Sequence, residues 1–430
     1  MKIDGNVLIT GGAGFIGLEV SRQLSDLGCS LVLFDNLSPQ VHGAIPDLCK
    51  HRLLQSLRVN SSQLNGPQGN GRPQVKVLRG DVSHPADWAA ALDGTTSVVH
   101  LAAETGTAQS MYEISRYTET NVGGTAHLLN HLANRKHTVT KIVLASSRSV
   151  YGEGAYRCER CGVVYPRARS EERLRAARWQ PECPACQGPI DAVATSEEAP
   201  TAPASIYAAT KLAQEDLVRI GARALGIPAV IFRLQNVYGE GQSLKNPYTG
   251  ILSIFSTQLR TGKTIHLYED GQESRDFVHV SDAGRAIVLG LASDAADGAT
   301  LNVGSGRPTS VERIALLLQE HFGGTTPPVV SGDYRAGDIR HGYADLTAIR
   351  SRLGFAPRVS LEAGLARFAA WVKSQPVEPD RLDQATEELA ARGLMQTRLS
   401  ADVAKDAAAE IGDKVVDGIL THGNAKAASV

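Results

Sequence analysis

The chain has 430 residues, 42% of them hydrophobic, which is enough to bury the cores of two or three packed units. Its 44 Lys and Arg residues nearly balance 45 Asp and Glu residues, and this charge argues against a protein that binds nucleic acid. No stretch approaches the ~18 consecutive apolar residues of a transmembrane helix, and the N-terminus lacks the apolar core of a signal peptide. We therefore expect a cytoplasmic protein without a membrane-spanning segment.

Predicted strands and helices alternate along the first half of the chain. An apolar run at 7–9 is followed by a glycine-rich turn, a helical pattern that ends near Leu27, and a second strand, 31–34, that leads to Asp35. Further buried strands are predicted at 75–78, 97–101, 141–145 and 229–232. This alternation predicts an α/β fold, a Rossmann-type doubly wound parallel sheet covered by helices on both faces.

The remaining segments divide the chain into units of different composition. The expected units are a Rossmann domain at 1–235, an insert within it at 156–190, a smaller C-terminal substrate lobe at 236–373 with segments that return to the sheet, and an Ala-rich extension at 374–430. Residues 40–74 contain a polar, glycine-rich stretch that is typical of a surface loop.

A dinucleotide fingerprint follows the first strand. Gly11 permits a tight turn, Gly14 lets the backbone approach a pyrophosphate, and Gly17 allows close packing of helix and strand. The N-terminus of the following helix then offers N–H groups to the phosphates. Asp35 closes the second strand 21 residues after Gly14, where its carboxylate can bind a ribose diol and would repel a 2′-phosphate. We therefore expect NAD rather than NADP.

A second motif combines Tyr207 and Lys211, four residues apart on a predicted helix. They share one helix face, and a nearby cation lowers the pKa of a tyrosine, which makes Tyr207 a usable base near neutrality. Ser147 follows the buried strand 141–145, at the edge of a parallel sheet where ligands bind.

With these motifs together, the chain resembles the extended short-chain dehydrogenase/reductase family, and within it the nucleotide-sugar epimerases and dehydratases. The resemblance runs from Val7 to about Trp371. The further motifs that carry it are His100–Ala103, Asn121–Thr125, Arg233–Gly239, Arg275–Val280 and Arg335–Asp338.

The resemblance implies a role for each matching residue. Ser147 would hold the sugar hydroxyl that is oxidised, Tyr207 would remove its proton while C4 passes a hydride to the nicotinamide, and Lys211 would hold the ribose hydroxyls. The cofactor residues implied by the fingerprint and the resemblance are Gly11, Gly14, Phe15, Ile16, Gly17, Asp35, Asn36, Asp81, Val82, Leu101, Ala102, Ala103, Asn121, Tyr207 and Lys211.

Four residues are expected on the substrate, besides Ser147. Asn236 and Arg275 would bind its diphosphate, and Arg335 and Asp338 would lie near its nucleotide. A guanidinium can donate two parallel hydrogen bonds to phosphate oxygens, which independently supports Arg275 as a diphosphate ligand. The alternative is a surface arginine that pairs with Asp276.

The residues after Ser147 favour one reaction. Dehydratases of the family carry an Asp-Glu pair here, whereas this chain has Arg148 and Ser149, so elimination lacks its acid and base. We expect a nucleotide-sugar epimerase that inverts C4 with tightly bound NAD and assembles as a homodimer. A net NAD-dependent nucleotide-sugar oxidoreductase or dehydratase, a decarboxylase, a C2 epimerase and an NAD(H)-binding redox sensor stay open as alternatives.

The sugar is suggested by two segments that we expect to line the pocket. Residues 109–113 and 246–250 resemble dTDP-L-rhamnose 4-epimerases, and a UDP-hexose or UDP-uronate 4-epimerase is the main alternative. Glu104 either faces the sugar or caps a helix.

The insert carries two Cys-x-x-Cys pairs. Cys158 and Cys161 are separated by 21 residues from Cys183 and Cys186, a spacing typical of a structural four-thiolate zinc site. The insert has too few apolar residues to fold alone, so zinc should fold it as a zinc-ribbon-like unit. Two disulfides or a redox pair are the alternative.

Overall fold

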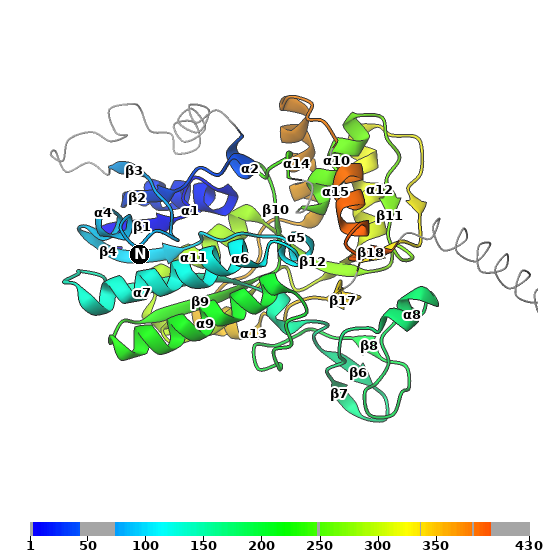
Figure 1. Cartoon of the computed structure of the whole chain (residues 1–430), viewed down its shortest axis with the longest axis horizontal. Helices are drawn as coiled ribbons and strands as arrows, with labels where there is room; N and C mark the ends of the chain where they lie inside the picture. The colour runs from blue at the N-terminus through cyan, green and yellow to red at the C-terminus, as the bar shows by residue number, and fades with distance from the viewer. Residues whose placement is uncertain (1–2, 44–73, 247–249, 336, 381, 397–430) are drawn as a thin grey trace, which may run out of the picture.

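The computed structural model describes residues 3–43, 74–246, 250–335, 337–380 and 382–396 (Figure 1). Most of the predicted loop at 40–74, with Cys49, and the end of the C-terminal extension lie outside the described residues. No helix in these ranges is both long and apolar enough to cross a membrane.

A seven-stranded sheet forms the centre of the molecule, with strand order β13-β9-β5-β4-β1-β2-β3 and every pair parallel. Its strands are β1 (Asn6–Thr10), β2 (Ser30–Asp35), β3 (Val75–Arg79), β4 (Thr95–His100), β5 (Lys141–Ser147), β9 (Ala229–Leu234) and β13 (Thr300–Val303). The chain winds outward from β1 in both directions, so the predicted Rossmann-type sheet is confirmed.

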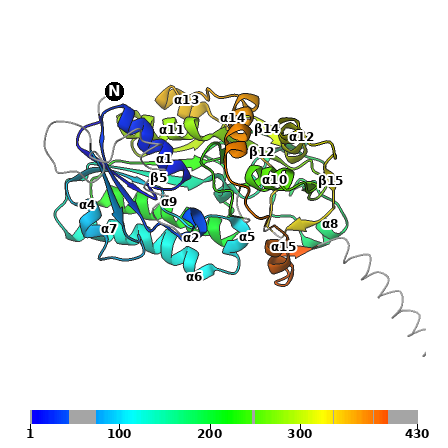
Figure 2. The ribbon, with the colours of Figure 1, turned by 90° about the horizontal axis from the view of Figure 1, so that it is seen from above.

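Helices cover both faces because successive side chains of each strand point to opposite sides. Val7 and Ile9 pack with α1 (Phe15–Asp26), α11 (Val280–Ala292) and α13 (Thr347–Leu353). Leu8 packs on the opposite face with α4 (Trp88–Leu92), α7 (Gly124–Asn134) and α9 (Ile206–Ala224). Figure 2 shows α11 and α7 on opposite sides of the sheet. β13 and α11 come from beyond residue 235, within the range where we expected the substrate lobe and segments that return to the sheet.

The smaller lobe is built on β10 (Asn236–Tyr238) and β12 (Ser274–His279), which pair in parallel, with β14 (Pro308–Ser310) and β17 (His341–Gly342) also on β12. Its helices α10 (Ile251–Arg260), α12 (Val311–Phe322) and α14 (Leu361–Ser374) share one hydrophobic core. β10 follows β9 almost directly, so the lobe begins at the carboxyl edge of the central sheet.

The insert forms a small three-stranded sheet of its own, in the order β7-β6-β8. Its elements are β6 (Tyr156–Cys158), β7 (Gly162–Val164), α8 (Glu171–Arg175) and β8 (Asp191–Ala192). In Figure 1 it projects beside the lobe, away from the central sheet.

The described part of the C-terminal extension packs on the lobe. It contains α15 (Leu382–Ala390) and β18 (Met395–Gln396), and β18 pairs antiparallel with β16 (Tyr334–Arg335). Ala385, Leu389 and Met395 are buried, so this stretch is part of the folded unit rather than a solvated appendage.

A buried ion pair docks α9 onto the sheet and gives a test of this packing. The Arg233 Nε and Nη2 atoms donate to Glu215 at 2.9 and 2.7 Å, and both side chains are at most 5% exposed. Replacing Arg233 with Met leaves the Glu215 carboxylate uncompensated, so the free energy of unfolding in urea should fall by about 3–5 kcal/mol.

The matched control is Arg219→Gln, because Arg219 is 44% exposed and contacts the same Glu215 at 3.4 Å. Its effect should stay within about 0.5 kcal/mol. Similar losses in the two variants would contradict a dominant role for the buried pair.

Candidate active site

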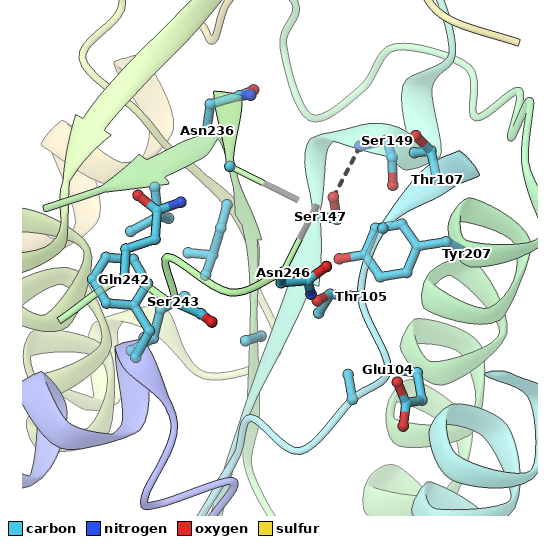
Figure 3. Close-up of a pocket in the computed structure, with 18 of the residues that line it drawn as sticks. Glu104, Thr105, Thr107, Ser147, Ser149, Tyr207, Asn236, Gln242, Ser243 and Asn246 are labelled. Carbon is cyan, nitrogen blue, oxygen red and sulfur yellow. Dashed lines mark hydrogen bonds between the residues drawn. The ribbon is translucent and has the colours of Figure 1, made fainter. Parts of the chain in front are cut away.

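A cavity of about 580 Å³ lies between the carboxyl edge of the central sheet and the smaller lobe. Its walls come from the loops after β1, β2, β4 and β5 on one side and from the lobe on the other. Figure 3 shows the hydroxyl of Tyr207 and the side chain of Ser147 facing this space, with Asn236, Gln242 and Ser243 across from them.

The fingerprint glycines form one end of the cavity. Gly11 has a φ of +66°, and a Cβ on Gly17 would lie 2.2 Å from the Gly11 carbonyl oxygen, so neither position accepts a side chain. α1 begins after Gly14 with no side-chain cap and no acidic residue in its first turn. Its first N–H groups therefore stay available to an anion, as a pyrophosphate requires.

Asp35 stands beside this turn. Its Oδ2 accepts a hydrogen bond from the Ala13 N–H at 3.0 Å, and its Oδ1 accepts one from the Leu37 N–H at 2.8 Å. These bonds fix the carboxylate at the cavity wall, where it can accept hydrogen bonds from a ribose diol. The donor set at this end fits NAD.

Most residues expected on the cofactor line the cavity: Gly11, Gly14, Phe15, Ile16, Gly17, Asp35, Asn36, Val82, Leu101, Ala102, Ala103 and Tyr207. Three do not. Asp81 holds Asn36 in place by accepting from its Nδ2 at 2.9 Å. Asn121 and Lys211 lie behind the cavity wall.

Asn121 is completely buried and its amide is used inside the protein. Its Oδ1 accepts from the Glu104 N–H at 2.8 Å, and its Nδ2 donates to the Glu104 carbonyl at 3.1 Å and to Thr210 Oγ1 at 2.9 Å. Asn121 does not line the cavity, and its contact with the cofactor or with water bound to it stays a prediction. Asn121 instead joins the loop after β4 to α9, a role that its motif alone did not distinguish.

Ser147 and Tyr207 come together from elements far apart in the sequence. Ser147 ends β5, and its Oγ accepts from the Ser149 N–H at 3.2 Å (Figure 3). Tyr207 is the second residue of α9, whose start is fixed by Ser205, which caps the Ala208 N–H, and by Ser110, which accepts from the Tyr207 N–H at 3.0 Å.

Three effects act on the pKa of Tyr207. Burial raises this pKa, while hydrogen bonding with Ser147 and the positive charge of Arg148 oppose the rise. Lys211 lies deeper, where its Nζ donates to the Ala145 carbonyl at 2.9 Å and burial lowers its pKa to about 8. The predicted roles of Lys211, on the phenol and on the ribose hydroxyls, stay predictions.

Arg148 is half-buried and lines the cavity directly after Ser147. Burial and the nearby Arg275 lower its pKa to about 10, and Asp338 and Glu153 oppose this shift. Within the described ranges, no hydrogen bond from its guanidinium is found, so its donors remain available to a substrate.

The four expected substrate residues, Asn236, Arg275, Arg335 and Asp338, all line the same cavity. Arg275 uses its terminal nitrogens on carbonyls, with Nη1 donating to Arg340 at 3.0 Å and Nη2 to Ile339 at 2.8 Å. The alternative that it pairs with Asp276 is wrong, because Asp276 is fully buried and accepts N–H bonds from residues 305, 306 and 344.

Some cavity residues were not foreseen. Tyr268 stacks against Arg335, with the guanidinium carbon 4.8 Å from the ring centroid. Glu273 also lines the cavity, and burial raises its pKa to about 7. Glu273 directly precedes β12 and lies two residues before Arg275, and this spacing is the signal in the sequence that could have pointed to Glu273.

The loop after β4 also corrects an expectation. Glu104, Thr105 and Thr107 line the cavity, whereas 109–113 do not, and Gln109 is buried beneath Tyr117. Glu104 faces the cavity rather than capping a helix, and burial raises its pKa. From the second segment, Asn246 and Gly250 line the cavity, and 247–249 lie outside the described residues.

The four insert cysteines form a separate cluster. Their Sγ atoms all lie within 4.8 Å of one another, and Cys158 and Cys186 are 3.6 Å apart, too far for a disulfide. A tetrahedral zinc with bonds of ~2.3 Å would hold its sulfurs about 3.8 Å apart, so the cluster fits this ion. The residue that follows each pair, Gly162 and Gln187, has a positive φ, of +77° and +59°, which closes a tight turn behind the two cysteines.

Comparisons with known proteins found that the chain is similar to enzymes named for their nucleotide-sugar substrates. It is 38% identical to the dTDP-L-rhamnose 4-epimerase of Burkholderia thailandensis, over 87% of this chain and 96% of that protein. It also resembles the solved UDP-glucuronic acid 4-epimerase of Bacillus cereus with UDP-glucuronic acid and NAD (25% identity, TM-score 0.66, 86% of this chain and 99% of that one). A third similar protein is the solved dTDP-glucose 4,6-dehydratase of Streptomyces venezuelae with NAD bound. The two are 26% identical with a TM-score of 0.66, over 86% of this chain and 97% of that one.

The family comparison leaves out only a small part of the N-terminal two thirds of the chain. The model described as "NAD dependent epimerase/dehydratase family" matches residues 7–170 and 181–304. The unmatched stretch between them, 171–180, lies inside the cysteine insert, whereas the four cysteines and Arg169 fall within the matched ranges. With its sheet, its glycine turn and its Ser147–Tyr207 site, the chain belongs to the NAD-dependent epimerase/dehydratase family.

Proposed function

We propose that the protein is a nucleotide-sugar 4-epimerase that works with bound NAD, and that dTDP-L-rhamnose is its substrate. The observation that carries the proposal is that Ser147 and Tyr207 face one cavity between the NAD end and the substrate lobe, next to Arg148 and Ser149. The identity with a dTDP-L-rhamnose 4-epimerase supports the choice of sugar. A homodimer in the cytoplasm stays a prediction.

The side chains at the site divide the work of a reversible oxidation. Tyr207 takes the proton of the C4 hydroxyl and, after the 4-keto sugar has turned its other face to the cofactor, returns the proton to the same oxygen. Ser147 donates a hydrogen bond to that oxygen. Arg148 favours the anionic form of Tyr207 and offers free donors to the sugar. NAD, when bound, accepts the hydride and gives it back, so it need not be replaced between turnovers.

The residues beside Ser147 favour epimerisation over elimination. A 4,6-dehydratase needs an acid and a base to remove water, and at the positions directly after Ser147 this chain has a guanidinium and a hydroxyl. An arginine whose pKa is about 10 stays protonated at neutral pH, so it cannot replace the missing base.

The reaction can be followed directly by proton NMR. The purified protein, with no NAD added, should convert dTDP-L-rhamnose into its C4 epimer, and UDP-hexoses should react more slowly or not at all. A keto product, or a need for added NAD, would indicate a net oxidoreductase. No reaction with any of the dTDP- and UDP-sugars tested would count against an epimerase and favour a redox sensor.

The pH profile tests Tyr207 and Arg148 together. A base must be deprotonated, so kcat/KM should rise with pH through the pKa of Tyr207. Arg148→Gln removes the charge that opposes the rise of this pKa, so the acidic limb should move to higher pH.

Arg148→Lys keeps the charge and should leave the limb near its wild-type position. Tyr207→Phe should lower kcat by about 10²- to 10⁴-fold at every pH. An unchanged limb in Arg148→Gln would show that Arg148 does not act on the base.

We also propose that the four cysteines bind a structural zinc ion. Elemental analysis of the purified protein should find about one zinc per chain. Cys161→Ser should lose it, because three thiolates leave the tetrahedral site incomplete. Cys29→Ser is the control, since Cys29 is buried in the Rossmann core and should not affect the metal. Intact protein two or four mass units lighter than its reduced form, without zinc, would instead support disulfides.

A further inference from the structure

A buried cluster of charges joins the cysteine insert to the wall of the substrate cavity. It consists of Glu153, Arg169, Glu269 and Arg340, whose side chains are at most 5% exposed. Arg169 donates from Nη1 and Nη2 to the two Glu269 oxygens at 2.9 and 2.8 Å, and its Nε lies 3.3 Å from Glu153 Oε1. Such paired contacts fix both planar groups in one orientation.

Each member of this buried cluster comes from a different part of the fold. Glu153 follows the catalytic segment at Ser147, and Glu269 lines the cavity from the lobe. Arg340 lies just beyond Asp338, and its Nη1 reaches Glu269 Oε2 at 3.0 Å. Arg169 is the one contribution of the insert, from the stretch between β7 and α8.

Arg169 also holds the backbone next to the cavity. Its Nη2 donates to the Asp338 carbonyl at 2.9 Å, and the Arg340 N–H donates to Glu153 Oε2 at 2.9 Å. Arg275 binds the carbonyl of Ile339 between them. Residues 338–340 are thus fixed one after another, and the first of them, Asp338, lines the cavity.

The position of Arg169 depends in turn on the fold around the cysteines. Tyr156 packs with Cys158 and Cys183 in the small core of the insert, and its hydroxyl donates to Glu153 at 3.2 Å. Trp179 accepts a hydrogen bond from Arg169 Nη1 through its carbonyl, and its ring lies 6.1 Å from that of Tyr334. The insert therefore contacts the segment 334–340 on both sides of the cavity residues Arg335 and Asp338.

We propose that Arg169 is a positioning residue for the nucleotide-sugar, through which the cysteine insert sets the affinity for the nucleoside diphosphate half of the substrate. Arg169 does so without touching the substrate, by fixing Glu269 and the Asp338 backbone in the cavity wall. The NAD end lies across the cavity and has no contact with this buried cluster among the described residues. The inference rests on the proposed function for its class of ligand.

The experiment measures binding of dTDP and UDP by calorimetry, together with kcat, KM and retained NAD. Arg169→Gln should weaken nucleotide binding and raise KM by about tenfold or more, with kcat within about threefold and NAD content unchanged. Arg169→Lys keeps the charge but not the paired geometry, so its loss should be intermediate. Arg178→Gln is the matched control in the same insert, because Arg178 is 52% exposed and its Nη2 contacts Glu172 Oε1 at 3.3 Å within the insert. This variant should bind both nucleotides as the wild type does.

A second variant covers the case in which Arg169→Gln does not fold, since it removes a guanidinium that contacts two buried carboxylates. Trp179→Ala removes another contact of the insert with segment 334–340 and leaves no charge unpaired, so it should raise KM in the same direction by a smaller factor. Wild-type nucleotide affinity in the folded variants would overturn the proposal, as would equal losses of NAD and kcat, which indicate general destabilisation. The proposed function alone would fail if the wild type bound dTDP or UDP tightly but epimerised no sugar. Binding of neither nucleotide by the wild type would overturn both the proposed function and the role of Arg169.

Discussion

The active site depends on one buried carboxylate, that of Glu215, which joins the three elements that meet behind it. It accepts hydrogen bonds from Ser146 on β5 and from Arg233 on β9, while the rest of its helix, α9, carries Tyr207. Ser147 is the next residue along β5, so the distance between serine and tyrosine is set by this contact. A charge this deeply buried is tolerated only because its partner and hydrogen bonds are in place, which makes the register of α9 on the sheet hard to change.

On this frame the two halves of the cavity are built differently. The NAD end is made of backbone: a glycine turn, a free helix N-terminus and a carboxylate fixed by two N–H groups. The substrate end is made of side chains, many of them charged, that come from the lobe and from segment 334–340. This division suits the chemistry, because a cofactor that stays bound needs a rigid seat, whereas a sugar that must turn over within the cavity is held by its diphosphate.

Two segments outside the central sheet reach the substrate half. The insert contacts segment 334–340 through Arg169 and Trp179, and the extension adds β18 to β16 in the same segment. The family model matches Arg169 and the four cysteines and leaves 171–180 of the insert unmatched. Changes in these segments would alter the wall of the substrate half and keep the Ser147–Tyr207 chemistry.

The sequence by itself determined the first strands of the sheet, the glycine turn, Asp35 and the two Cys-x-x-Cys pairs, because each follows from a short-range pattern whose geometry is local. The family resemblance, not a local pattern, placed Ser147 and Tyr207 in one site and predicted that segments beyond residue 235 return to the sheet. The sequence did not identify β13 and α11 as those segments, nor show whether Asn121 and Lys211 face a ligand or the protein. The tertiary structure alone decided that the charge of Arg148 acts on Tyr207 and that Arg169 reaches Asp338. Contacts between charges distant in sequence depend on how separate elements pack and how much water is excluded, and no local pattern encodes either.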